Sequence, residues 1–563
     1  MTIYESLKAA PFNLTDAQVA DIRSRIDTMP LADRVAQVFF LILLGDKPED
    51  LELVLKMKPG GVTRFFSDDL DRETTQMQRI FDSLPIPPLV SADMEGSHLS
   101  FAFGTKVPNQ MAFAAVDDPA LTGSCSALMA REGRTMGVTW SFTPVIDINA
   151  AFRSSIVGSR SYGSDVARIE RHALAHIEGL QSNGIAATVK HWPGEGYDDR
   201  DQHLVTTQNP LSLEEWQASF GRLYRAAFDA GVLSIMSAHI GFPAYMQSID
   251  PDCGIDAYRP ASINPALTTR LLREEMGFNG IVVSDATEMG GMSAWISHRE
   301  MPTEVLRAGC DVILFSLDPE ADMAQVRGSV ESGSLPESRL NEAVARVLAL
   351  KTVVGLLDGT HRPATAETAR ARLRQPEDAA LAEEAFRRAP TLVKDVNKTL
   401  PVSPQTHKRV LIIETGIRNA LMGWENKPLD VADMLRAEGF EVQVYDKDTF
   451  EGPTYDPAKT DLVLYLMADE SLNMKSHIYI DWFRMMGDFF RTTERPWHDI
   501  PTVMVGFGHP YFLYDAPRVP TYVNAYSTLP EMQQAVVDAL TGKTPFVASS
   551  PVDAFCGQGQ ARY

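Results

Sequence analysis

Eight short apolar runs alternate with amphipathic stretches between residues 33 and 350, and this alternation restricts the fold more than any other feature of the sequence. The runs lie at 35–44, 60–66, 88–93, 138–147, 187–192, 233–240, 280–286 and 312–317. Helix-like stretches separate them, for example at 118–137, 166–184, 213–231 and 265–280, and several open on Asp or Pro and close on Gly, as helices often do. Eight strands alternating with helices predict a (β/α)₈ barrel. A doubly wound parallel sheet is the alternative.

A second alternating region follows the predicted barrel. Residues 355–390 lack strand signals and are expected to form a linker with helical portions, whereas apolar runs recur at 409–416, 440–446, 461–469 and 500–508. This pattern predicts a smaller α/β sandwich. The expected domains are therefore a barrel at 1–354, a linker at 355–390 and a sandwich at 391–563.

Net charge, apolar runs and cysteine spacing exclude several classes of partner and of structural site. A formal net charge of -22 argues against the nucleic-acid backbone or an anionic membrane as the main partner. No apolar run reaches the roughly 18 residues that a membrane span needs, and the N-terminus has no signal-peptide pattern. A cytoplasmic location is expected. The four cysteines are far apart and include no CxxC pair, so neither a disulfide framework nor a zinc site is predicted.

Polar residues gather where the apolar runs end. At such ends lie Asp93, Asp147, Lys190, His191, His239 and Asp285. In a (β/α)₈ barrel the carboxyl ends of the strands surround the catalytic mouth, so these side chains are expected to meet there. Each also has a structural interpretation: Asp285 as a helix cap, Asp147 as a loop anchor and His239 as a hydrogen-bonded core histidine.

The most densely ionisable segment is KHWPGEGYDDRDQH, residues 190–203. It resembles the KHFPGHG…D-S-H signature of the β-N-acetylglucosaminidase branch of glycoside hydrolase family 3. Similar segments occur in the family's order along most of the chain: MPLADRVAQVF, VSADMEGS, GSRSYGSD and RPASINPALTTRLLREEMGFNGIVVSDATEM in the predicted barrel, then AFRRAPTLVKDVNKTLPV and VGFGHPYFLYDAPRVPTYVNAYS in the second domain.

The resemblance implies a role for each matching residue. Asp285 falls at the catalytic nucleophile, which forms a covalent glycosyl-enzyme, and His203 at the general acid/base with Asp201 as its partner. The positions that hold the hydroxyls of the sugar in the first subsite correspond to Asp93, Arg160, Lys190 and His191. Two residues depart from the pattern: Glu195 stands where the family usually has histidine, and Gln202 where it usually has serine or threonine.

The chemistry of the residues agrees with these roles. Residues i and i+2 of an extended or irregular segment can point to one side, so Asp201 is expected to hydrogen-bond one nitrogen of His203, fix its tautomer and raise its basicity. Such a histidine can protonate a leaving oxygen and then accept a proton from water. Structural alternatives are a solvated charged loop at 198–203, a strand-end salt bridge at Lys190 and His191, and pairing of Arg160 with Asp165.

The leading hypothesis is a retaining exo-β-N-acetylglucosaminidase that needs no metal or organic cofactor and acts on muropeptide or chitin-derived oligosaccharides. The first alternative is a β-glucosidase or β-xylosidase of the same family, whose acid/base glutamate would come from the second domain. The next is a phosphorylase, because a histidine acid/base does not repel incoming phosphate. The last is a catalytically idle sugar-binding protein. The oligomeric state is expected to be monomer or homodimer.

Overall fold

The computed structural model describes residues 2–45, 47–99, 102–415, 429–471 and 474–563 and contains a closed parallel barrel. Two parallel sheets form most of its wall, ordered β1-β2-β3-β4 and β5-β7-β9. Their strands are β1 (Phe40–Leu44), β2 (Gly61–Phe65), β3 (Leu89–Ala92), β4 (Trp140–Ser141), β5 (Thr188–Trp192), β7 (Ser234–Ser237) and β9 (Ile281–Ser284).

Single bridges close the wall. Trp140 pairs with Ala186 and Val145 with Lys190, which joins the two sheets, while residues 312 and 313 pair with Val283 and Phe39. The eighth run, 312–317, therefore completes the barrel through isolated pairs and forms no regular strand. The predicted (β/α)₈ barrel is confirmed, although two further runs, the fourth and the first, also contribute less strand than predicted. The fourth narrows to two residues ahead of Pro144, which cannot donate to a ladder, and residues 35–37 belong to helix α3 (Leu31–Gln37).

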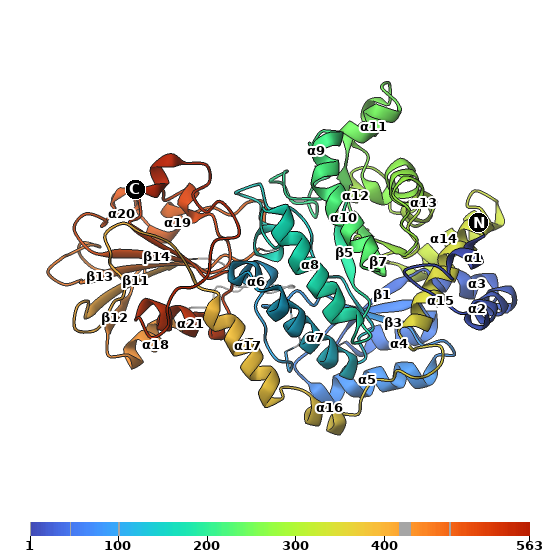
Figure 1. The fold of residues 1–563 in the computed structure, drawn as a ribbon, viewed down its shortest axis with the longest axis horizontal. Coiled ribbons are helices and arrows are strands. Elements are labelled where there is room, and N and C mark those ends of the chain that lie inside the picture. Colours follow the sequence, from blue (N-terminus) through green and yellow to red (C-terminus); the bar gives the residue numbers. More distant parts are fainter. Residues whose placement is uncertain (1, 46, 100–101, 416–428, 472–473) are drawn as a thin grey trace.

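Helices cover the outside of the barrel, so the strands are buried on both faces (Figure 1). Among them are α4 (Pro48–Met57), α5 (Leu70–Ser83), α7 (Pro119–Thr135), α8 (Val166–Gln181), α10 (Phe220–Asp229), the π-helix η4 (Ala266–Glu275), α13 (Met301–Ala308) and α15 (Glu337–Val353). Local signals start several of them. Asp118 caps α7 by accepting a hydrogen bond from the Leu121 amide, and Asp165 caps α8 in the same way through Arg168.

The second domain is an α/β sandwich built on one six-stranded sheet, as predicted. The strand order is β10-β15-β14-β13-β11-β12, and only the β10–β15 pair is antiparallel. The strands are β10 (Thr391–Asp395), β11 (Arg409–Thr415), β12 (Glu441–Val444), β13 (Leu462–Met467), β14 (Thr502–Gly506) and β15 (Thr521–Asn524). Alternate residues of β11 and β13 enter two separate cores, one on each face. Sequence patterns missed β10 and β15 as strands, and residue 416 lies outside the described residues.

Helices flank this sheet: α18 (Val431–Ala437) and α21 (Pro530–Leu540) pack in one core, and α19 (Trp482–Met486) contributes to the other. The linker region carries α16 (Ala366–Arg372) and α17 (Pro376–Arg388), and α17 runs between the domains against α7 and α21 (Figure 1).

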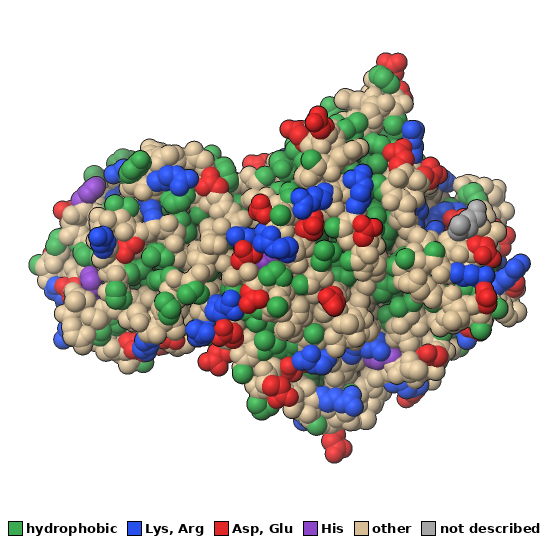
Figure 2. All heavy atoms as spheres, viewed as in Figure 1, with side chains coloured by type: hydrophobic (Ala, Val, Ile, Leu, Met, Phe, Trp, Pro, Cys, Tyr) green, Lys and Arg blue, Asp and Glu red, His purple; other side chains and the backbone are tan. Residues whose placement is uncertain are grey.

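The two domains share packing. Met111, Ala112 and Ala115 of the barrel helix α6 (Gln110–Val116) belong to the same core as β11, β13 and α21. Ala468, the first residue after β13, belongs to this shared core as well. The boundaries at residues 354 and 390 stay a prediction. Within the described residues no helix is both long and apolar enough to cross a bilayer. Figure 2 shows acidic and basic side chains interspersed over the visible face of the molecule.

Candidate active site

A cavity of about 440 Å³ opens at the carboxyl ends of the barrel strands, where the polar strand ends were expected to meet. Six of the predicted site residues line it: Asp93, Arg160, Lys190, His191, His203 and Asp285. Asp201 lies behind His203 with no exposed side-chain surface. The loop after β13 adds Glu470, Ser471 and Met474 to the lining. The cavity is thus formed by both domains.

A buried ion cluster forms one wall of the cavity. The Glu95 carboxylate accepts two hydrogen bonds from the Arg160 guanidinium, from Nε and from Nη2, both at 2.8 Å. Lys190 Nζ lies 2.8 Å from Glu95 and 3.1 Å from Asp93. Burial alone would raise the pKa of Glu95, but Arg160 and Lys190 outweigh burial and hold that pKa far below its usual value. The cluster therefore contains two cationic and two carboxylate side chains, so its formal charges cancel, and all four residues line the cavity.

The structure contradicts the Arg160–Asp165 pairing considered from the sequence, whereas the strand-end salt bridge at Lys190 is present. Arg160 pairs with Glu95 and not with Asp165, which instead caps α8. Lys190 does make strand-end ion pairs, and these pairs place its ammonium group at the cavity. Sequence reasoning missed Glu95, although it stands only two residues after Asp93 in the same VSADMEGS segment.

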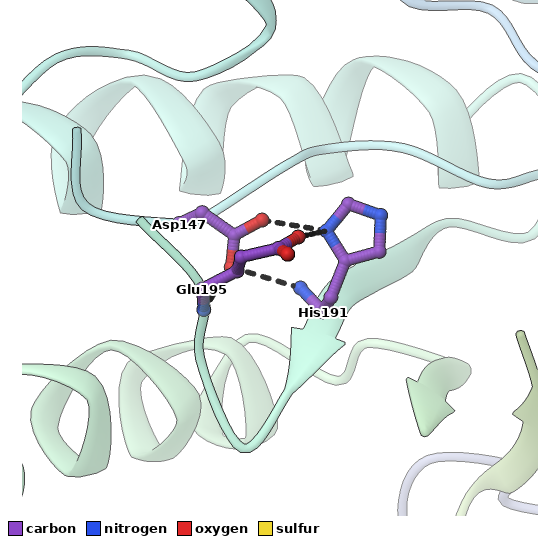
Figure 3. A group of neighbouring side chains, drawn as sticks. All are labelled: Asp147, His191 and Glu195. Carbon is purple, nitrogen blue, oxygen red and sulfur yellow. Dashed lines mark hydrogen bonds and ion pairs between the residues drawn. The ribbon is translucent and has the colours of Figure 1, made fainter. Parts of the chain in front are cut away.

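His191 is held by Asp147, as Figure 3 shows. Its Nδ1 lies 2.6 Å from Asp147 Oδ2, while Asp147 Oδ1 accepts the backbone amides of His191 at 3.1 Å and Glu195 at 2.8 Å. This arrangement leaves Nε2 of the imidazole for the cavity. The potential ligand atoms of the three side chains lie within 4.8 Å of one another, a spacing that a metal ion accepts. Hydrogen bonds already occupy these atoms, with Gln202 and Thr207 on Glu195, so we propose no metal there.

Asp201 and His203 contact each other within a tight turn. Asp201 Oδ1 accepts from the His203 backbone amide at 2.8 Å and lies 2.7 Å from His203 Nδ1. The Asp201 carbonyl accepts the amides of Leu204 and Val205, so the segment is a turn and not an extended strand. The second Asp201 oxygen accepts the Met474 amide of the second domain at 2.7 Å. Residues from both domains therefore hold the carboxylate that orients His203.

Asp285 lies directly after β9 and is partly buried in the barrel mouth. Its amide donates to the Ser237 carbonyl, and its Oδ1 accepts the Ala286 amide at 2.8 Å. Burial would raise the pKa of Asp285, but the neighbouring imidazoles of His191, His239 and His203 lower it below its usual value. The group is therefore an ionised carboxylate at neutral pH, as an attacking nucleophile must be.

His239 takes the structural position that its sequence context suggested. Its Nδ1 lies 2.8 Å from Ser262 Oγ and its Nε2 2.8 Å from the Ala286 carbonyl, so both ring nitrogens have partners. Burial lowers its pKa, although the charge of Asp285 acts in the opposite direction. We expect His239 to support the segment that carries Asp285.

Glu470 is a further carboxylate at the cavity that sequence reasoning missed, because the second domain supplies it. It accepts hydrogen bonds from Ser97 Oγ at 3.0 Å and Thr528 Oγ1 at 2.7 Å, and lies 3.4 Å from His98 Nε2. Burial would raise the pKa of Glu470, but His98 and the hydrogen bonds from Thr528 lower it. Its oxygens are engaged in holding the domain junction.

These features define a carbohydrate-active barrel enzyme, with a strand-end carboxylate and an aspartate-paired histidine on one cavity. The protein belongs to glycoside hydrolase family 3, because the model of the family's N-terminal domain matches residues 31–350, more than half of the chain. The resemblance indicated by the sequence motifs is thereby confirmed.

The names of similar proteins give two kinds of activity, glycosidase and phosphorylase. The chain is 35% identical over 562 residues to a β-N-acetylglucosaminidase/β-glucosidase of Cellulomonas fimi, covering 98% of this chain and 99% of that one. It is 33% identical to a β-hexosaminidase of Vibrio cholerae over 48% of this chain and 80% of the relative. Among solved structures it is similar to the β-glucoside phosphorylase BglX bound to 2FGlc, with 30% identity, a TM-score of 0.91 and coverage of 98% and 99% of the two chains.

Proposed function

We propose that this enzyme removes a terminal β-linked N-acetylglucosamine or glucose unit from a small glycoside and transfers it to inorganic phosphate. The observation that carries the proposal is the Asp201–His203 pair, which is fixed by both domains at a cavity that also contains Asp285. Its substrate range is drawn from the names of the full-length relatives.

The first step uses Asp285 as a carboxylate and His203 as a proton donor. An Asp285 oxygen attacks the anomeric carbon, the bond to the leaving oxygen breaks, and His203 Nε2 gives that oxygen its proton. Asp201 stabilises the imidazolium before the transfer and keeps Nδ1 protonated after it. The product is a sugar ester on Asp285 with a neutral His203. The ion cluster of Asp93, Glu95, Arg160 and Lys190 is expected to hold the sugar hydroxyls during this step.

The second step distinguishes phosphate from water. A phosphate oxygen attacks the anomeric carbon, the ester bond breaks, and Asp285 leaves as a carboxylate. A glutamate acid/base would be anionic at this point and would repel the phosphate by about 1 kcal/mol at ~4 Å in water and about 4 kcal/mol at an effective dielectric constant of 20. Neutral His203 exerts no such repulsion. The whole-chain similarity to a β-glucoside phosphorylase supports the same acceptor.

The deciding experiment measures product formation from aryl β-N-acetylglucosaminide and aryl β-glucoside with and without phosphate. We expect the rate to rise with phosphate and the product to be a sugar 1-phosphate of retained β configuration, since two successive inversions restore the starting geometry. Free sugar formed at an unchanged rate would overturn phosphate as the acceptor and leave the hydrolytic N-acetylglucosaminidase. A preference for one of the two aryl substrates identifies the sugar; cleavage of muropeptide or chitin fragments and a cytoplasmic location stay predictions.

A further inference from the structure

The two residues of the charged loop that depart from the family pattern contact each other. Gln202 Nε2 donates to Glu195 Oε2 at 3.0 Å, and the two side chains are only 0% and 3% exposed. Only six residues lie between them, so the contact closes the loop on itself. Neither residue was assigned a catalytic or binding role by sequence.

Gln202 lies between the two members of the acid/base pair, and its own contacts fix the peptide that joins them. Its Oε1 accepts the His239 backbone amide at 3.0 Å. Its carbonyl accepts the Gly291 amide at 3.1 Å, and the His203 carbonyl accepts the Gly290 amide at 2.8 Å. The turn is thus attached to the segment that follows Asp285.

Glu195 connects this turn to the sugar-binding end of β5. Its amide donates to the same Asp147 oxygen that accepts the His191 amide, and its second oxygen accepts from Thr207 Oγ1 at 3.4 Å. Burial, together with the charges of Asp147, Asp201 and Asp285, raises the pKa of Glu195 well above its usual value. The raised pKa favours the neutral form of Glu195, which adds no negative charge to the loop.

We propose that Glu195 and Gln202 act as one positioning pair, which holds the Asp201–His203 turn so that the His203 imidazole faces the leaving group. The inference rests on the proposed function, because it needs His203 to be the acid/base. A pair that only stabilised the fold would affect all substrates alike. Loss of a positioning pair should instead slow only the reactions that need a proton from His203.

The test compares two classes of glycoside in the full-length enzyme. Alkyl glycosides need protonation of the leaving oxygen, whereas dinitrophenyl glycosides do not. For Glu195→Leu and Gln202→Leu we expect kcat/KM to fall about tenfold to hundredfold on the alkyl substrate, the usual effect of an unsatisfied buried hydrogen-bonding group. On the dinitrophenyl substrate it should stay within about threefold. The double variant should be no slower than the slower single variant, since the residues act as a unit.

Conservative and control variants separate positioning from folding. Glu195→Gln keeps a neutral group with an acceptor oxygen and is expected to recover most of the alkyl rate lost in Glu195→Leu. Gln181 is a matched control at the opposite end of the barrel, where its Oε1 accepts the Leu233 amide just before β7. Gln181→Leu should lower the thermal midpoint without changing the alkyl-to-dinitrophenyl ratio. If a leucine variant fails to fold, Gln202→Asn, with both amide atoms on a shorter side chain, carries the same expectation.

Three results would overturn the inference: equal losses on both substrates in a folded variant, additive losses in the double variant, or an unchanged alkyl rate. His203→Ala separates this failure from failure of the proposed function. If that variant loses alkyl turnover selectively while the pair variants do not, only the positioning role is wrong. If His203→Ala loses both substrates equally, the acid/base assignment itself is wrong.

Discussion

Replacing Glu95 by glutamine tests how strongly the ion cluster stabilises the barrel mouth. The carboxylate accepts three short hydrogen bonds from cations, two from Arg160 and one from Lys190. Glu95 and Lys190 have side chains that are 2% and 3% exposed, so solvent cannot replace the lost partner. Removing one member of a buried ion pair costs about 3–5 kcal/mol. Because Asp93 still contacts Lys190, we expect the lower value, about 3 kcal/mol.

The assay is urea unfolding of Glu95→Gln and its parent at neutral pH, with the free energy of unfolding obtained from the midpoint and slope. Glu52→Gln is the control. Glu52 pairs with Arg79 on the surface at 2.7 Å, where both side chains are about half exposed or more, so its loss should cost less than about 1 kcal/mol. We also expect a higher KM for Glu95→Gln, since Arg160 loses the group that orients it toward the sugar.

The pH dependence of the stability difference between Glu95→Gln and its parent gives a second test of the ion cluster. The pKa of Glu95 is lowered in the folded state, so its stabilising effect is present above the unfolded pKa of about 4.3 and is lost as pH falls below that value. The difference between parent and variant should therefore shrink on acidification. A difference below about 1 kcal/mol at neutral pH, or one that persists unchanged into acid, would refute the reasoning.

Three further predictions concern the reacting groups. Asp285→Ala should lower kcat for both aryl sugars by roughly a thousandfold or more in steady-state assays, and retention of activity would exclude Asp285 as the nucleophile. Asp201→Asn should reduce turnover of alkyl glycosides more than that of dinitrophenyl glycosides, because it removes the charge that stabilises the His203 imidazolium; equal losses would contradict this role. Glu195→Gln should unfold at higher urea concentration than the parent at neutral pH and equally near pH 4. The raised pKa of Glu195 costs about 1.4 kcal/mol per pH unit once the unfolded chain ionises, and an unchanged midpoint would argue that Glu195 is charged.

The barrel could be predicted from sequence because its signals are local. Apolar runs, Asp and Pro at helix starts and Gly at helix ends act within a few residues, as at Asp118 and Asp165. The Asp201–His203 contact is local too, since only Gln202 lies between its members. The sequence patterns missed β10 and β15 because the conformation of such short strands depends on pairing with neighbouring strands. The eighth run of the barrel forms only single bridges, so it is not a regular strand.

The sequence by itself determined the order of the elements, the family motifs and the residues that stand at strand ends. Tertiary structure alone decided which of these residues became partners. Arg160 meets Glu95 across 65 residues and Asp201 meets Met474 across 273, and no local pattern records contacts at such separations. Burial then decided their charge states, because removal from water favours a neutral Glu195 while two adjacent cations keep Glu95 ionised.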